Sequence, residues 1–101
     1  MATPQELAER IAAKPYPKVI SSVMESRIVD TQYWQPEGTC LTVCMLRIDN
    51  GYTVCGESGC ADPRNFDAQL GRDLARQAAF NKLWPLFGFA LAEDLKEGRV
   101  E

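Results

Sequence analysis

Three arginines near one predicted helix start are the residues most suited to chemistry in this chain. Arg64 precedes that helix, and Arg72 and Arg76 lie four residues apart within it, so that they share one face. The first amides of a helix have no partner inside the helix and carry partial positive charge. Together with guanidinium groups they can bind a phosphate. The alternative is a solvated helix face on which the arginines pair with Asp67 and Asp73.

Aromatic residues near these arginines can supply a flat surface for a ligand. Tyr33 and Trp34 end a predicted strand beside a turn, and Phe66 begins the helix next to Asn65. A purine-like or nicotinamide-like ring can stack on such a surface, although packing in the core is the alternative for each aromatic residue. The candidate ligand-binding residues are therefore Trp34, Arg64, Asn65, Phe66, Arg72 and Arg76.

The acidic residues of the same region favour a structural role over catalysis. Glu57, Asp62 and Asp67 can form a carboxylate cluster, and a carboxylate pair can do acid–base work. Asp62 and Asp67, however, precede a helix, where a carboxylate caps free amides. The chain contains no His, which removes the usual general base and the commonest metal ligand. We therefore expect no enzyme activity, no catalytic residues, no metal and no cofactor.

The four cysteines are predicted to be reduced thiols. Cys40 and Cys44 share one face of a predicted strand, Cys55 lies on the next strand, and Cys60 follows that strand. Without His, a zinc site would need all four thiolates. Buried thiols in a cytosolic protein are the default interpretation, and a disulfide, a metal site or a reactive thiol are the alternatives.

Size and charge limit the possible classes of protein. The 101 residues suggest one domain, and the net charge of −3 argues against binding of a nucleic-acid polymer, which needs clustered Lys and Arg. No apolar run has the length needed to span a bilayer, and the N-terminus lacks the pattern of a secretory signal. We expect a cytosolic protein that does not bind membranes.

The first third of the chain is predicted to contain two helices and a strand. Thr3, Pro4 and Glu6 form a helix start with a capping box, and this helix should end near Lys14. Apolar residues at helical spacing indicate a second short helix from about Pro17. Strand-forming residues then dominate residues 26–35.

A β-hairpin should follow, built from residues 39–49 and a returning strand after Asn50 and Gly51. This dipeptide is a strong signal for a two-residue turn, which would place Arg47 opposite Val54 and Asp49 opposite Tyr52. In that register both faces of the hairpin are substantially apolar. We therefore expect helices on one face and another layer, such as a second subunit, on the other.

The last predicted element is a long helix from Asn65 or Asp67 towards Leu86, ended or kinked by Pro85 and Gly88, with a short helix after it. The fold class is therefore α+β: a small antiparallel sheet of about three strands packed by a long C-terminal helix. Within a single domain, residues 1–25 form a helical extension, residues 26–97 form the core, and residues 98–101 form a loose tail. The inner side of the long helix is assigned to Leu70, Gly71, Leu74, Ala75, Ala78 and Ala79.

Residues 41–91 resemble a family of small tailed-phage accessory proteins. The shared pattern is a strand, Asn-Gly and an aromatic residue, then a strand with Gly-Glu-Ser, a Cys, Asp-Pro-x-Asn-Phe-Asp, and a helix with Gly and Leu-Trp. The matching residues are Asn50, Gly51, Tyr52, Gly56, Glu57, Ser58, Cys60, Asp62, Pro63, Asn65, Phe66, Asp67, Gly71, Leu83 and Trp84. Cys40 and Cys55 lie outside the pattern, and Ala78 stands where many relatives have Asn.

This resemblance implies a function, because proteins similar to the family include Thoeris anti-defence proteins that bind cyclic ADP-ribose-type signals without cleaving them. We therefore expect a phage counter-defence protein of the host bacterial cytosol. It should sequester a nucleotide-derived messenger, cyclic ADP-ribose-like or a cyclic oligonucleotide, as a homo-oligomer (dimer or larger). The main alternative is a protein–protein inhibitor or adaptor that binds a host protein and presents an exposed apolar patch. A hydrolase or nuclease acting on the messenger is a further alternative, but no metal triad or nucleophile–base pair can be assembled from the sequence.

Overall fold

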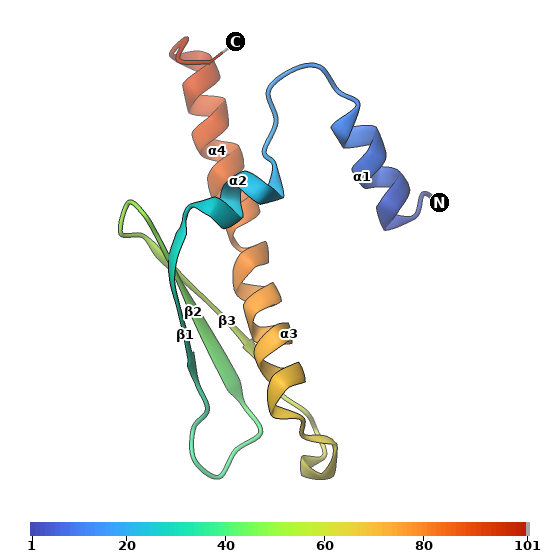
Figure 1. Ribbon diagram of the computed structural model, residues 1–101, viewed down its shortest axis with the longest axis vertical. Coiled ribbons are helices and arrows are strands. Elements are labelled where there is room, and N and C mark those ends of the chain that lie inside the picture. The colour runs from blue at the N-terminus through green and yellow to red at the C-terminus, as the bar shows by residue number, and fades with distance from the viewer. Residues whose placement is uncertain (101) are drawn as a thin grey trace.

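The computed structural model describes residues 1–100 and consists of one three-stranded antiparallel sheet with a long helix across one of its faces (Figure 1). The strand order is β1-β2-β3, so neighbours in sequence are neighbours in the sheet. The predicted α+β class and strand number are confirmed. The elements are α1 (Pro4–Ala12), α2 (Ser21–Ser26), β1 (Ile28–Trp34), β2 (Thr42–Ile48), β3 (Thr53–Ser58), a 3₁₀ turn η1 (Pro63–Asn65), α3 (Ala68–Asn81) and α4 (Leu83–Lys96).

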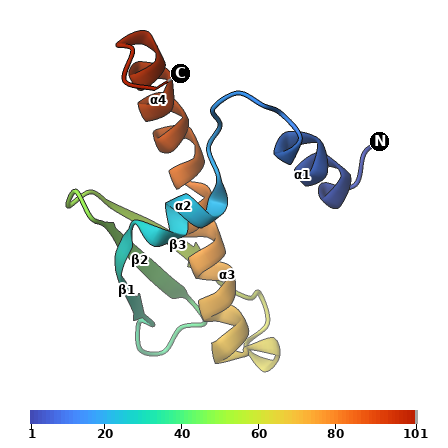
Figure 2. The ribbon, with the colours of Figure 1, turned by 45° about the horizontal axis from the view of Figure 1, so that its top comes forward.

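The N-terminal helix begins as the sequence predicts. The Thr3 side chain accepts a hydrogen bond from the Glu6 amide (3.1 Å), and Pro4 occupies the first helical position. The second helix is shorter than predicted, because α2 begins only at Ser21 and the segment after α1 is irregular. This irregular segment, residues 13–20, carries α1 away from the sheet, and α1 stands apart from the other elements in both ribbon views (Figures 1 and 2).

The predicted hairpin register is wrong by one residue. Arg47 pairs with Thr53 and Leu46 pairs with Val54, while the Ile48 amide donates to the Tyr52 carbonyl (2.8 Å). The connection is therefore a three-residue loop of Asp49, Asn50 and Gly51. Only Gly51 has a positive φ, of 92°, which fits a turn closed by a glycine bulge and excludes the two-residue turn that needs Asn50 in the same region. The Asn50 side chain instead accepts a hydrogen bond from the Tyr52 amide (2.9 Å).

The register decides which residues of β3 face the core, since a shift of one residue exchanges the two faces of a strand. Val54 and Gly56 point to the α3 side, together with Cys44 and Leu46 of β2. The outer face receives Thr53, Cys55 and Glu57 from β3, so it is more polar than the predicted register implies. No helix covers this outer face in the described chain (Figure 1).

The core lies between the inner face of the sheet and α3, and α2 and the start of α4 close one end of it. Its fully buried side chains include Met24 of α2, Leu46 of β2 and Leu83 of α4. The members of the core are Met24, Cys44, Leu46, Ile48, Val54, Ala75, Ala79, Phe80 and Leu83. At about 25 cal/mol per Å² of buried apolar area, such a cluster is the main source of stability in this fold.

Two glycines allow α3 to approach the sheet closely. A Cβ at Gly56 would lie 2.7 Å from the Ala78 carbonyl carbon and even closer to backbone atoms of Ala75 and Ala79. A Cβ at Gly71 would lie 2.9 Å from Thr42 Oγ1. The prediction that small residues bring this helix onto the sheet is confirmed for Gly71, Ala75 and Ala79.

The long C-terminal helix is bent at Lys82, where α3 ends and α4 begins. Pro85 explains the bend, because it has no amide hydrogen to donate to the Asn81 carbonyl and its ring crowds that carbonyl. Leu70 and Leu74, which were predicted to face the sheet, are 53% and 52% exposed. They point sideways because Gly71, Ala75 and Ala79 form the stripe that contacts the strands.

The end of α4 is capped by Gly98, whose φ is 74° and whose amide donates to the Leu95 carbonyl (3.2 Å). The amide and guanidinium of Arg99 bond to Asp94. The predicted loose tail covers residues 98–101, of which Glu101 lies outside the described residues.

Candidate functional site

The three arginines of the predicted anion site bond to three different partners in the structure. Arg64 pairs with Asp62 (2.6 Å), and the Arg72 guanidinium donates to Gln69 Oε1 (2.9 Å). Arg76 forms an ion pair with Glu25 of α2, from a part of the chain far away in sequence. Each guanidinium therefore has a partner already, and Arg76 ties α3 to α2.

Capping carboxylates occupy the helix start at which phosphate binding was predicted. Asp67 accepts a hydrogen bond from the Leu70 amide (3.1 Å), and Asp62 accepts one from the Arg64 amide (3.0 Å). The capping interpretation of these two acids is thus confirmed. Hydrogen bonds from the Arg64 guanidinium and, to a smaller extent, from the Arg64 amide hold the pKa of the Asp62 carboxyl below its usual value. A bound phosphate would have to displace or lie beside these negative charges.

The predicted aromatic residues lie on different sides of the sheet. Phe66 and Asn65 line a shallow hollow of about 50 Å³ at the start of α3, between the end of β3 and the side of the helix. Trp34 lies opposite Val43 on the outer face of the sheet, which α3 does not cover, and is 65% exposed. The structure therefore brings Asn65 and Phe66 together but places Trp34 elsewhere.

The thiols occupy three different environments. The four cysteines are free: Cys44 is buried, Cys55 is exposed, and Cys40 and Cys60 are half-buried side by side at the same hollow. Burial raises the pKa of the Cys44 thiol, and partial burial together with the neighbouring Cys40 raises the pKa of the Cys60 thiol. Within residues 1–100 no three His, Cys, Asp or Glu side chains lie close enough to bind a metal ion.

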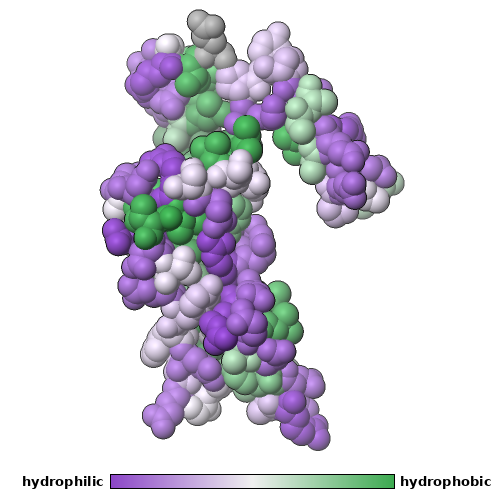
Figure 3. All heavy atoms as spheres, in the orientation of Figure 1, coloured by the Kyte–Doolittle hydropathy of each residue, from purple (hydrophilic) through white to green (hydrophobic). Residues whose placement is uncertain are grey.

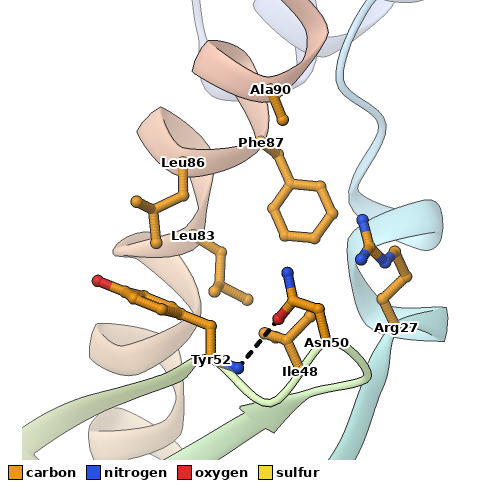
Figure 4. A pocket seen from close by; sticks show the side chains of 8 residues that line it. All are labelled: Arg27, Ile48, Asn50, Tyr52, Leu83, Leu86, Phe87 and Ala90. Carbon is orange, nitrogen blue, oxygen red and sulfur yellow. Dashed lines mark hydrogen bonds between the residues drawn. The ribbon is translucent and has the colours of Figure 1, made fainter. Parts of the chain in front are cut away.

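A larger cleft lies where the β2–β3 turn meets the first turns of α4 and the end of α2 (Figure 4). Its volume is about 270 Å³, close to the lower end of small-molecule sites. Ile48 and Leu83, both buried, form its floor. The lining residues are Arg27, Ile48, Asn50, Tyr52, Leu83, Leu86, Phe87 and Ala90.

The polar and aromatic groups of this cleft are arranged around one open space. Figure 4 shows Tyr52 and Arg27 on opposite sides, with Asn50 and the Phe87 ring between them. The Arg27 guanidinium lies 5.2 Å from the centroid of the Phe87 ring, within the range of a cation–π contact. The Asn50 oxygen is held by the Tyr52 amide, so that its amide nitrogen is directed towards Phe87 (Figure 4).

An ion pair fixes the position of the charged group of the cleft. Arg27 Nε and Nη2 donate to Asp49 Oδ1 at 3.0 and 2.7 Å, and the Asp49 amide donates to the Arg27 carbonyl (2.9 Å). These bonds lower the pKa of the Asp49 carboxyl and raise the pKa of Arg27. The cleft thus offers a guanidinium paired with a carboxylate, two aromatic rings and a side-chain amide, a set of groups that can bind a flat polar ring.

The sequence did not indicate this cleft, because its parts come from residues 27, 48–52 and 83–90. Tyr52 had one usable signal, as the aromatic residue after Asn-Gly in the phage-protein pattern. No signal in the sequence pointed to Arg27, because only the pairing of β1 with β2 brings it to its partner Asp49.

The chain belongs to the Phage protein (N4 Gp49/phage Sf6 gene 66) family, whose model matches residues 3–95. The match extends the resemblance seen in residues 41–91 to nearly the whole chain, including α1. No curated protein and no solved structure matches the chain significantly. Among the helices of residues 1–100, none has the length and apolar character required to cross a membrane.

Proposed function

We propose that this phage protein binds a small nucleotide-type ligand in the cleft beside the hairpin turn and sequesters it without altering it. The observation that carries the proposal is the cluster of Arg27, Asn50, Tyr52 and Phe87 around one cleft of about 270 Å³. The proposed role needs tight binding and no catalytic step. In a phage protein, the corresponding biological role is removal of a nucleotide-derived signal of host defence.

The chemistry of the cleft suits the parts of such a ligand. The Tyr52 ring is exposed and can therefore stack on a base. Such stacking contributes about 1–3 kcal/mol per base. Arg27 is held in place by Asp49 and retains donor groups for a phosphate or a ribose hydroxyl. The buried floor of Ile48 and Leu83 excludes water from one side of the ligand.

The start of α3 remains the second location for the ligand. Of the predicted residues, Asn65 and Phe66 line its hollow of about 50 Å³, which has room for a few water molecules, so a nucleotide can bind there only if side chains move apart. The cleft requires no such movement.

Purified protein should be tested by thermal melting with cyclic ADP-ribose and with a cyclic dinucleotide. We expect one of them to raise Tm, and intact ligand to be recovered after heat denaturation of the complex. A chemically altered ligand would replace sequestration by an enzymatic function, and the absence of any shift with a broad nucleotide panel would contradict the proposal.

The location of the site is tested by matched aromatic substitutions. Tyr52→Ala should raise Kd at least tenfold, which corresponds to about 1.4 kcal/mol. Tyr16→Ala is the control, because Tyr16 is an exposed tyrosine of the irregular segment before α2, outside the cleft. Loss of binding in Arg72→Ala with normal binding in Tyr52→Ala would instead place the site at the start of α3.

A second candidate function, binding of a host protein, is favoured by a separate observation. Large apolar side chains of α1 and α4 are exposed, among them Ile11 and Phe89. This candidate predicts that a Phe89→Glu variant no longer protects the phage in a host that carries the defence system, while its nucleotide binding is unchanged. Sequestration through the cleft predicts loss of protection in Tyr52→Ala.

A further inference from the structure

Helix α1 has an apolar side that nothing in the described chain covers. Leu7 and Ile11, one helical turn apart, are 48% and 55% exposed, and α1 contains no buried residue. A helix of nine residues is marginal in water without packing partners. Yet its start is well formed, with the Thr3 cap and Pro4. We therefore expect the side of α1 that carries Leu7 and Ile11 to pack against another apolar surface.

Helix α4 is apolar on several sides and is likewise uncovered over most of its length. Trp84 and Leu95 are partly exposed on one side, and Phe89, on another side, is 69% exposed. A helix that is apolar all round normally lies inside a larger core. Figure 3 shows hydrophobic side chains over α4 and on the side of α1 that faces it.

An open slot separates the two helices. It is lined by Ala8, Ile11 and Ala12 of α1, by residues 18–21 and by Trp84 of α4, with a volume of about 440 Å³. The irregular segment of residues 13–20 closes one end of the slot and holds α1 away from α4 (Figures 1 and 2). The slot is thus mainly apolar, and Lys18 and Ser21 lie at its closed end.

The exposed area of the chain matches what a stable self-association would bury. The chain exposes 7381 Å², whereas a folded monomer of 11.3 kDa is expected to expose about 5,700 Å². The excess of roughly 1,700 Å² exceeds the ~800 Å² that each partner contributes to an interface of standard size. The radius of gyration is 16.6 Å, against about 13 Å for a compact chain of this length.

Charge does not select the occupant of the slot. Arg10, Lys14 and Lys18 line a second hollow at the base of α1, but α1 also carries Glu6 and Glu9. The last turn of α4 carries Glu93, Asp94 and Lys96, and Asp94 pairs with Arg99. The exposed apolar side chains select the occupant, because a second copy of the chain offers the same apolar surfaces to the slot.

We propose that two copies of this chain form a dimer in which α4 of each copy enters the slot between α1 and α4 of the other. The two α4 helices then pack together, and α1 of each copy lies over α4 of its partner. This arrangement is a reciprocal, two-fold contact, the commonest symmetry of small oligomers. It covers Ile11 and Phe89 and leaves the outer face of the sheet free. The proposal does not depend on the ligand or on its site.

Light scattering after gel filtration tests the association. Wild-type protein at about 50 μM should have twice the monomer mass, and Ile11→Glu and Phe89→Glu should each shift it to the monomer, with far-UV circular dichroism that keeps the signal of the sheet and α3. Trp34→Glu is the matched control, because Trp34 is as exposed as Phe89 but lies on the outer face of the sheet. A monomeric wild type, or a dimer that survives both substitutions, overturns the proposal; so does a dimer lost only in Trp34→Glu.

Cross-linking tests the exchange of α1. A photoreactive amino acid at position 11 in a mixture of ¹⁴N and ¹⁵N protein should give cross-links between α1 of one isotope and α4 of the other. Cross-links from α1 to α4 found only within chains of one isotope would show that α1 folds back on its own α4, which contradicts the exchange.

Discussion

The two halves of this molecule differ in how completely they bury their apolar residues. Where α3 crosses the sheet, residues such as Leu46 and Ala79 have no exposed surface, and the backbones of helix and strand touch at Gly56. In α1 and the outer part of α4, large apolar residues face solvent. The first half is a fully packed core. The second half has apolar residues as a core does, but no other element of the described chain covers them. We infer that stability comes from the first half and association from the second.

The largest loss of stability is expected from a side chain at Gly56, in the packed half. Gly56→Ala would place a methyl group against the backbone of α3 at Ala75, Ala78 and Ala79, where no side-chain movement can relieve the overlap. We expect a loss of about 3 kcal/mol or more of unfolding free energy, measured by urea denaturation. Gly59→Ala is the control, since its nearest neighbour would be the Cys40 carbonyl oxygen at 3.8 Å. Equal stability of the two variants would refute the close contact.

A pair of truncations compares the halves directly. Leu46→Ala removes a fully buried side chain from the core and should cost about 2–5 kcal/mol. Phe89→Ala removes a larger but mostly exposed side chain and should change the stability of the monomer by less than about 0.5 kcal/mol. Both variants should be unfolded in urea at sub-micromolar concentration, so that self-association does not contribute. A large cost for Phe89→Ala would mean that α4 is already packed within one chain.

A smaller effect is expected at the ion pair that links α2 to α3. Arg76 pairs with Glu25 of another helix, whereas Arg72 bonds to Gln69 on its own helix. Arg76→Ala should lower stability by about 1 kcal/mol, and Arg72→Ala should have no measurable effect. A double-mutant cycle with Glu25→Gln isolates the pair. If Arg72→Ala proves the more damaging variant, the assigned partners are incorrect.

The smallest effect is the dependence of stability on pH at the hairpin turn. Because Arg27 lowers the pKa of Asp49 in the folded state, this carboxylate stabilises the fold above its unfolded pKa of about 4. The contribution is lost as pH falls through the lower, folded value. Asp49→Asn should therefore reduce the slope of stability against pH below about pH 4, with little change in slope near neutrality. Parallel curves for wild type and variant below pH 4 would exclude this linkage.

Local signals predicted the elements of this fold better than the contacts between them. The Thr3 cap, the hairpin and the Asp62 and Asp67 caps depend on neighbouring residues and were read correctly. The hairpin register was predicted wrongly, because Asn-Gly fits both a two-residue turn and a longer loop with a glycine bulge. The choice depends on Gly56, which must face α3, and that contact is invisible in the sequence of the hairpin.

The candidate cleft was missed for the same reason. Arg27, Tyr52 and Phe87 lie in three separate segments, and no periodic pattern connects them. The arginines of α3 form a regular pattern, but Arg76 is used to hold α2, and Arg72 bonds to Gln69 on its own helix. A regular pattern of charges on a helix therefore identified a charged face, while the contacts of its arginines depend on partners that the pattern does not contain.

Hydrogen exchange at two protein concentrations tests the division of the molecule most directly. At 1 μM, amides of β2 and α3 should be protected while those of α1 and the outer turns of α4 exchange quickly. At 100 μM, we expect protection to rise in α1 and α4 and to stay unchanged in β2 and α3. Protection of α1 and α4 that is high at 1 μM, or low at both concentrations, would contradict the account.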